Sequence, residues 1–219
     1  MTLVVCFKGK DGLVLAGDSR GTIGDPRGLT AITDSMIKIF KLSEYVGAVA
    51  FGQAEMAAQL IEEVRNSLKG EKYFAQIFHV MRETLRKEYG SWMERVPREE
   101  RPVVGFIVAG FEENKDVRVY YLTSPLDFAP QLVQTGIALG GIPQYATYLT
   151  HRLYDSEMTM EQLIHLAVYV ISETATQDTK VGGPIRVAKI SWEKGYEELE
   201  QSLIREVIQK NEEAHKKLR

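Results

Sequence analysis

The sequence contains a single cysteine, Cys6, and no long hydrophobic run. One cysteine excludes an internal disulfide, and its place within an apolar run indicates that the thiol is buried as part of the packing. No apolar stretch approaches the ~18–20 residues of a membrane span. The first residues also lack the basic start and apolar core of a signal peptide. We therefore expect a cytoplasmic protein that has no membrane partner.

An excess of charge of one sign is also missing. The formal net charge is −3 at pH 7, which gives no electrostatic reason to expect binding to nucleic acid or to an anionic membrane. The chain has no glycine-rich phosphate loop, and its 4 histidines share no spacing typical of metal ligands. The sequence therefore predicts neither a cofactor nor a metal site.

The chain does contain enough apolar sequence for one sizeable core. It has 219 residues, of which 44% are hydrophobic, and this indicates a single domain. Apolar runs bounded by turn residues predict strands over residues 2–9, 12–18, 36–42, 45–51, 102–111, 117–123, 131–138 and 185–192. Helical spacing of apolar residues predicts helices over residues 54–68, 72–90, 143–154, 160–174 and 195–217.

This order of elements indicates the fold class. Blocks of strands and pairs of helices fit an α+β fold in which two stacked sheets are covered by helices on both outer faces, a four-layer αββα sandwich. We expect residues 1–193 to form this domain. Residues 194–219 are expected to add an amphipathic C-terminal helix that docks on the domain or on a neighbouring subunit. Residues 19–35 are expected to form a loop.

The first twenty residues carry the strongest functional signal. Two apolar runs flank the turn Lys10-Asp11-Gly12, and a hairpin of this length brings Asp18 back beside Thr2. Removal of Met1 would leave Thr2 with a hydroxyl and a free α-amine on one residue. The reference pKa of an α-amine is ~7.7–8.0, so the amine could act as a general base at neutral pH.

This start resembles the N-terminal-nucleophile hydrolases, specifically the proteasome β-type subunits and their bacterial relatives in the HslV and Anbu groups. In that family an N-terminal Thr is followed by a strand, a Lys-Asp-Gly turn and a string similar to Ala-Ala-Asp-Thr-Arg. The spacing from Thr2 to Asp18 matches without a gap, and the resemblance covers about residues 2–192. It implies the four-layer fold, cleavage of a polypeptide substrate, a ring or related oligomer of copies of the chain, and a possible ATPase partner.

The third residue of the predicted catalytic set is Lys38. It lies in the run of residues 36–42, which resembles a strand of the family. Close to Thr2, the ammonium of Lys38 would lower the pKa of the hydroxyl and favour the alkoxide. Asp18 would orient this lysine.

The resemblance also implies roles for two more residues and for the walls of the cleft. Gly52 ends a strand as the family's Ala-Gly does, and in the family the N–H of this glycine is the oxyanion donor. Asp178 lies in a loop similar to the family's Arg-Asp-x-x-Ser-Gly-Gly, where the Asp helps to position the N-terminal residue. Gly21, Thr22 and Ala50, together with Gly52, are the expected substrate-binding residues.

Two positions depart from the family pattern. Gly140 stands where the family has a serine that hydrogen-bonds the terminal amine, and Val181 stands where it has the serine of the Ser-Gly-Gly loop. A hydrogen bond to a charged group contributes roughly 1.5–3 kcal/mol. Waters could substitute for the missing hydroxyls.

Three functions therefore remain open from the sequence. The first is a threonine peptidase with Thr2 as nucleophile, Asp18 and Lys38 as its supporting pair, and Gly52 and Asp178 in the site. The second is an acyl-transfer enzyme similar to a connectase, in which an amine instead of water takes the acyl group. The third is a non-catalytic structural subunit of a proteasome-like ring.

Overall fold

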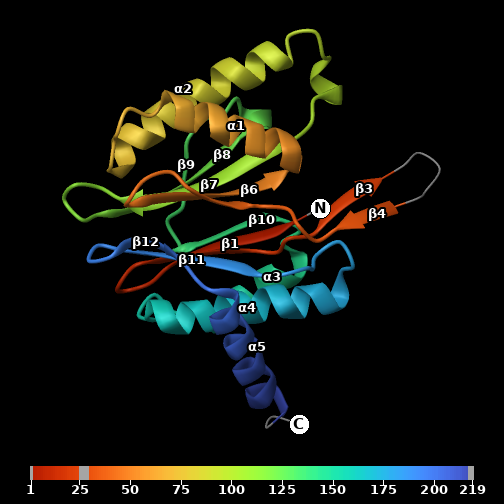
Figure 1. Cartoon of the computed structure of the whole chain (residues 1–219), viewed down its shortest axis with the longest axis vertical. Coiled ribbons are helices and arrows are strands. Elements are labelled where there is room, and N and C mark those ends of the chain that lie inside the picture. The colour runs from red at the N-terminus through yellow and green to blue at the C-terminus, as the bar shows by residue number, and fades with distance from the viewer. Residues whose placement is uncertain (1, 25–29, 217–219) are drawn as a thin grey trace.

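Two five-stranded sheets stack face to face between two layers of helices (Figure 1). The computed structural model describes residues 2–24 and 30–216. Met1, whose removal the proposed chemistry requires, lies outside the described residues, as do residues 25–29 of the expected loop and residue 217 of the expected last helix. The α+β fold class with four layers, predicted from the element order, is confirmed.

The two sheets have different strand orders. The first sheet runs in the order β10-β1-β2-β11-β12, with strands β10 (Ile137–Gly141), β1 (Leu3–Lys8), β2 (Leu13–Gly17), β11 (Arg186–Ser191) and β12 (Gly195–Glu198). The second runs β5-β6-β7-β8-β9, with β5 (Ile39–Lys41), β6 (Val46–Gly52), β7 (Val104–Phe111), β8 (Val117–Thr123) and β9 (Gln131–Leu132). All the described pairs of neighbouring strands are antiparallel.

Strand β1 shows why both faces of the first sheet are covered. Leu3, Val5 and Phe7 pack on the helix side, while Val4 and Cys6 pack against the second sheet. Because side chains of a strand alternate between its faces, a strand covered on both sides becomes an unbroken apolar run. Burial in this core raises the pKa of the Cys6 thiol.

Helices form the two outer layers. Helices α1 (Ala54–Ser67) and α2 (Phe74–Trp92) pack on the second sheet, and α3 (Gln144–Leu153), α4 (Met160–Gln177) and α5 (Gln201–Lys216) pack on the first. Short 3-10 helices cover Arg98–Glu100 and Ser124–Leu126. Helix α4 begins at a capping box formed by Thr159 and Gln162, a motif that satisfies free N–H groups of the first turn. None of the helices in the described ranges is long and apolar enough to cross a membrane.

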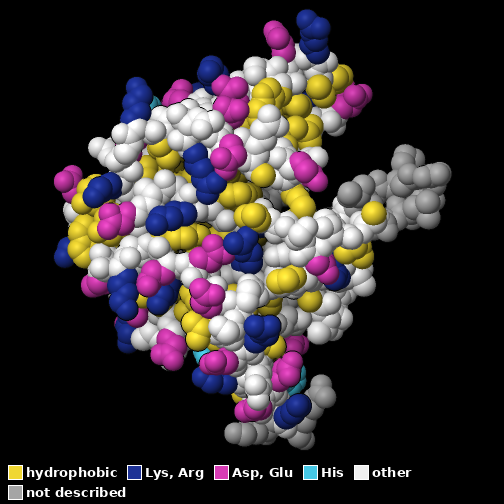
Figure 2. Space-filling view, viewed as in Figure 1, with side chains coloured by type: hydrophobic (Ala, Val, Ile, Leu, Met, Phe, Trp, Pro, Cys, Tyr) yellow, Lys and Arg dark blue, Asp and Glu magenta, His cyan; other side chains and the backbone are white. Residues whose placement is uncertain are grey.

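The surface carries charge of both signs. On the face shown in Figure 2, basic and acidic side chains are interspersed over the helices and the sheet edges. This mixture agrees with the small net charge of −3.

The single strand expected over residues 131–138 is wrong. Leu132 of β9 pairs with β8 in the second sheet, whereas Ile137 of β10 pairs with β1 in the first. The chain passes from the second sheet to the first in the residues that separate β9 and β10. There Val133 N–H donates to the carbonyl of Val119, and the carbonyl of Gly136 accepts from Lys8 N–H. One apolar stretch therefore serves two sheets.

Two other boundaries differ from the expectation. The loop expected over residues 19–35 contains a hairpin of β3 (Gly21–Gly24) and β4 (Thr30–Thr33), whose glycine-flanked strands pair with each other. The strand expected over residues 36–42 is shorter and begins at Ile39.

The last helix begins six residues later than expected, at Gln201. Residues 195–198 form β12 instead, because Tyr196 N–H donates to the carbonyl of Glu44 (2.7 Å) and its ring enters the core between the sheets. The domain boundary expected at residues 193 and 194 therefore falls within the β11–β12 hairpin.

The core under α1 yields a stability prediction. Ile61 is 0% exposed between α1 and the second sheet, whereas Ile37 is 52% exposed. We expect Ile61→Ala to lower the free energy of unfolding by ~2–5 kcal/mol because it leaves a cavity, and Ile37→Ala to change it by less than ~0.5 kcal/mol. Urea unfolding of both variants checks this, and an equal effect of the two would contradict the packing.

Candidate active site

The backbone of Thr2 is held by residues at the end of strand β10. Ile142 N–H donates to the carbonyl of Thr2 at 2.8 Å. Gly141, with φ +95°, lies so close that a Cβ on it would sit 1.7 Å from the same carbonyl oxygen. Only glycine fits this approach and this left-handed backbone. Thr2 itself is 3% exposed and directly precedes the buried strand β1.

Asp18 lies beside the start of β1, as the hairpin spacing predicts. Its Oδ1 accepts from Leu3 N–H at 2.9 Å and from Lys38 Nζ at 2.7 Å. Its Oδ2 accepts from Arg20 N–H at 3.1 Å and from Gly182 N–H at 3.2 Å. Four donors from separate parts of the chain thus converge on one buried carboxylate.

Lys38 is the buried cation of the site. From the sequence alone it could face solvent or the site, and the structure leaves it only 2% exposed. Its ammonium donates to Asp18 Oδ1 and, at 2.7 Å, to the carbonyl of Arg20. Burial lowers the pKa of Lys38, and the charge of Asp18 opposes this shift. Two hydrogen bonds that share Asp18 Oδ1 connect Lys38 to Leu3, the residue that follows Thr2.

A second charged contact closes the site on the side of residues 178–183. Arg20 makes a two-pronged pair with Asp34, with distances of 2.9 Å (Nε to Oδ1) and 3.1 Å (Nη2 to Oδ2). Its Nη1 donates to the carbonyl of Thr179 at 2.9 Å. Side chains at Gly182 and Gly183 would collide with Arg20 and Asp34 respectively. The double-glycine loop is therefore packed directly on this ion pair.

Asp178 and Val181 stabilise this loop from within. Asp178 Oδ1 accepts from Lys180 N–H at 2.9 Å, a turn that a loop aspartate commonly makes. Val181 is fully buried in the core beneath the first sheet. Gly182 N–H, and not Asp178, makes the contact from this loop to the Asp18 carboxylate. A role for Asp178 in positioning the N-terminal residue stays a prediction.

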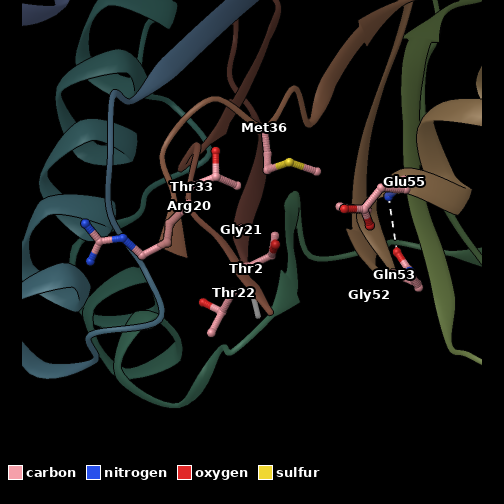
Figure 3. A pocket seen from close by; sticks show the side chains of 10 residues that line it. Thr2, Arg20, Gly21, Thr22, Thr33, Met36, Gly52, Gln53 and Glu55 are labelled. Atoms are coloured by element: carbon pink, nitrogen blue, oxygen red, sulfur yellow. Dashed lines mark hydrogen bonds between the residues drawn. The ribbon is translucent and has the colours of Figure 1, made fainter. Parts of the chain in front are cut away.

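A cleft of about 420 Å³ opens at Thr2 (Figure 3). Its lining comes from the residue before β1, the β3–β4 hairpin with its flanking residues, the end of β6 and the start of α1. The lining residues are Thr2, Arg20, Gly21, Thr22, Thr33, Met36, Gly52, Gln53, Ala54 and Glu55. The predicted substrate-binding residues Gly21, Thr22 and Gly52 thus lie together with Thr2. Ala50, also predicted to bind substrate, is instead 4% exposed in the core under α1. Its side chain lies on the helix face of β6, away from the cleft.

Gly52 ends β6 in a backbone conformation that suits glycine. Its φ is +93°, and a Cβ would lie 2.1 Å from the carbonyl oxygen of Val103. That carbonyl also accepts from Gln53 N–H at 2.9 Å. The end of β6 is therefore held tightly against β7 where it borders the cleft.

The ring of Phe51 fills the space of a side chain that the family pattern has at position 140. A Cβ on Gly140 would lie 2.3 Å from the Phe51 ring, and a Cβ on Gly105 would lie 2.2 Å from it. Gly140 belongs to the first sheet and Gly105 to the second. One aromatic ring is thus clamped between glycines of both sheets, and it takes the room that a serine at position 140 would need.

Sequence reasoning missed Asp34, Phe51 and Glu55 as site residues. Asp34 and Phe51 act through partners distant in sequence, and no motif marks them. Glu55 could have been noticed, since it follows Gly52 by three residues at the start of the predicted helix.

The clamp of Phe51 predicts a compensating pair of substitutions. We expect Gly140→Ser alone to lower the free energy of unfolding by ~1–3 kcal/mol, because the new side chain overlaps the ring. In the double variant Gly140→Ser/Phe51→Ala the overlap is relieved. Urea unfolding of the single and double variants measures the coupling, and strict additivity of the two single effects would contradict the clamp.

The buried ion pair predicts a second coupling. Lys38→Met leaves the Asp18 charge buried with one fewer donor, so we expect a loss of ~3–5 kcal/mol, partly recovered in Lys38→Met/Asp18→Asn. The pKa of Lys38 is lower in the folded protein, so the unfolded chain binds more protons between the two pKa values. Wild-type stability should therefore rise with pH in that alkaline window, and this rise should be absent in Lys38→Met.

Urea unfolding across pH checks both statements. Lys41→Met, on the exposed side of the neighbouring strand, is the matched control and should change the free energy of unfolding by less than ~0.5 kcal/mol. Equal effects of the two lysine substitutions would rule out a special contribution from Lys38.

Comparisons with known proteins agree with this geometry. The chain is 24% identical to the proteasome subunit beta of Methanopyrus kandleri, with 94% of this chain and 95% of the relative covered. It is 26% identical to proteasome subunit beta 2 of Ignicoccus hospitalis, with 86% and 84% covered. The family model described as proteasome subunit matches residues 2–190, which include Thr2, Asp18, Lys38 and the whole cleft. The chain therefore belongs to the proteasome subunit family.

Proposed function

We propose that this chain is a threonine peptidase in which Thr2, exposed as the N-terminal residue by removal of Met1, attacks the peptide bond. The observation that carries the proposal is the buried pair of Lys38 and Asp18, whose shared Oδ1 also accepts from Leu3 N–H. A buried ion pair is costly unless it is fully hydrogen-bonded. Such a pair beside a threonine that lines an open cleft fits an activated nucleophile.

The chemistry follows from the groups around Thr2. The neutral α-amine takes the hydroxyl proton as Oγ1 bonds to the substrate carbonyl carbon. Lys38 stabilises the developing negative charge, and Gly52 N–H donates to the oxyanion. The amine then returns the proton to the leaving nitrogen, the C–N bond breaks, and an ester on Thr2 remains. A water that gives a proton to the amine then attacks the ester carbonyl carbon. The C–Oγ1 bond breaks, the amine returns that proton to Oγ1, and the carboxylic acid product leaves.

A non-catalytic subunit is the second candidate, and one observation favours it. Gly140 and Val181 offer no hydroxyl to the Thr2 amine, and the space at Gly140 is filled by the Phe51 ring. Acyl transfer to an amine would use the same ester on Thr2 and differs only in the group that attacks it. Trapping that ester therefore separates both enzymes from the structural subunit.

We also propose that the chain works as a cytoplasmic homo-oligomer, in a ring or a related assembly. The relatives from three organisms are called proteasome subunits, and this supports an assembly of copies of the chain. A polypeptide substrate follows from the proposed reaction, and an ATPase partner stays a prediction from the resemblance.

Intact mass before and after treatment with a peptide epoxyketone tests the nucleophile. We expect a species lighter by one methionine residue that gains one probe, because this electrophile reacts with a hydroxyl and an α-amine on the same residue. Thr2→Ala should gain none. Thr147→Ala, at an exposed threonine of α3, should be labelled like the wild type.

Retention of Met1 in the presence of excess methionine aminopeptidase, with no label, would favour the structural subunit. A labelled protein that joins an added amine to the acyl product instead of releasing acid would favour acyl transfer.

A further inference from the structure

Two of the described residues that line the cleft have charged side chains, Arg20 and Glu55. The charge of Arg20 is already balanced by Asp34. The guanidinium of Arg20 is engaged by both oxygens of Asp34 and by the carbonyl of Thr179. Glu55 is the other, and within the described part of the chain its carboxylate has no ion-pair partner. Among these described side chains, a substrate therefore meets one uncompensated charge, and it is negative.

Glu55 is directed into the cleft by the start of α1. The Gln53 side chain accepts from Glu55 N–H at 3.1 Å and caps the helix. Figure 3 shows the Glu55 carboxylate pointing from the Gly52 side across the cleft toward the wall that contains Met36. An acidic residue in a first helical turn also stabilises the helix, but that contribution does not require a direction into the cleft.

The remaining walls fit a long side chain with a charged end. Met36 and Ala54 provide apolar surface in the same cleft as Thr2 and Glu55. Lysine and arginine bury their methylene stems on such surface while the charged group stays at the polar end.

We propose that this cleft selects peptides that carry a lysine or arginine next to the bond to be cleaved, with Glu55 as the group that recognises the cation. The cleavage part rests on the proposed function, whereas the binding preference does not. Because Glu55 is exposed in the open cleft, we expect a moderate effect that weakens with salt.

The test uses two fluorescent peptides that differ only by lysine or norleucine at one position. Binding to the full-length Thr2→Ala protein, measured by fluorescence anisotropy, removes cleavage from the comparison. We expect the lysine peptide to bind about 3–5-fold more tightly, which is the upper part of the range expected for an exposed ion pair. In Thr2→Ala/Glu55→Gln the two peptides should bind within about 2-fold of each other.

Glu62→Gln is the matched control, because it removes the same charge from an exposed position further along α1. It should leave the lysine preference unchanged. Equal binding of the two peptides, a preference retained without Glu55, or no binding of the lysine peptide at about 1 mM would each overturn the inference.

Cleavage by the wild-type protein separates this inference from the proposed function. A lysine preference in binding without cleavage or Thr2 labelling supports the inference and contradicts the peptidase. Cleavage and labelling without a lysine preference support the peptidase and contradict the inference.

Discussion

The ion pair between Lys38 and Asp18 is the contact on which the rest of the site depends. Burial of each ion costs several kcal/mol unless hydrogen bonds replace its hydration. For Asp18 the replacement comes from four places: the start of β1, Arg20 just before β3, the segment before β5 and the double-glycine loop. The pair can be buried only when these segments meet, so its formation fixes the start of β1 and with it Thr2.

Around this pair, apolar packing and a second ion pair support the site. Hydroxyls that the family pattern provides at positions 140 and 181 are absent, and apolar side chains occupy their surroundings. The Phe51 ring fills the room above Gly140, and Val181 is buried in the core. The loop that carries Val181 is held instead by Arg20 and Asp34. Shape and a peripheral ion pair thus hold this loop in place.

The sequence predicted what depends on neighbours along the chain. Asp18 could be placed beside Thr2 because a short hairpin determines its own register. Four layers followed from the order of strands and helices. Asp34 could not be found, since its partner Arg20 meets it only after the β3–β4 hairpin folds. The split of residues 131–138 and the strand at 195–198 also depend on distant partners, because strand propensity does not specify which sheet a strand joins.

Gly141 and Ile142 hold the carbonyl of Thr2 in place, and this has a practical consequence for how the protein is produced. Because Thr2 is held at the inner end of the cleft, any residue added before it starts from the place where substrate must bind. An affinity tag at that end would compete with substrate and block the α-amine. The other end of the described chain follows α5, on the outer side of the first sheet (Figure 1). Tags and surface attachments therefore belong after α5.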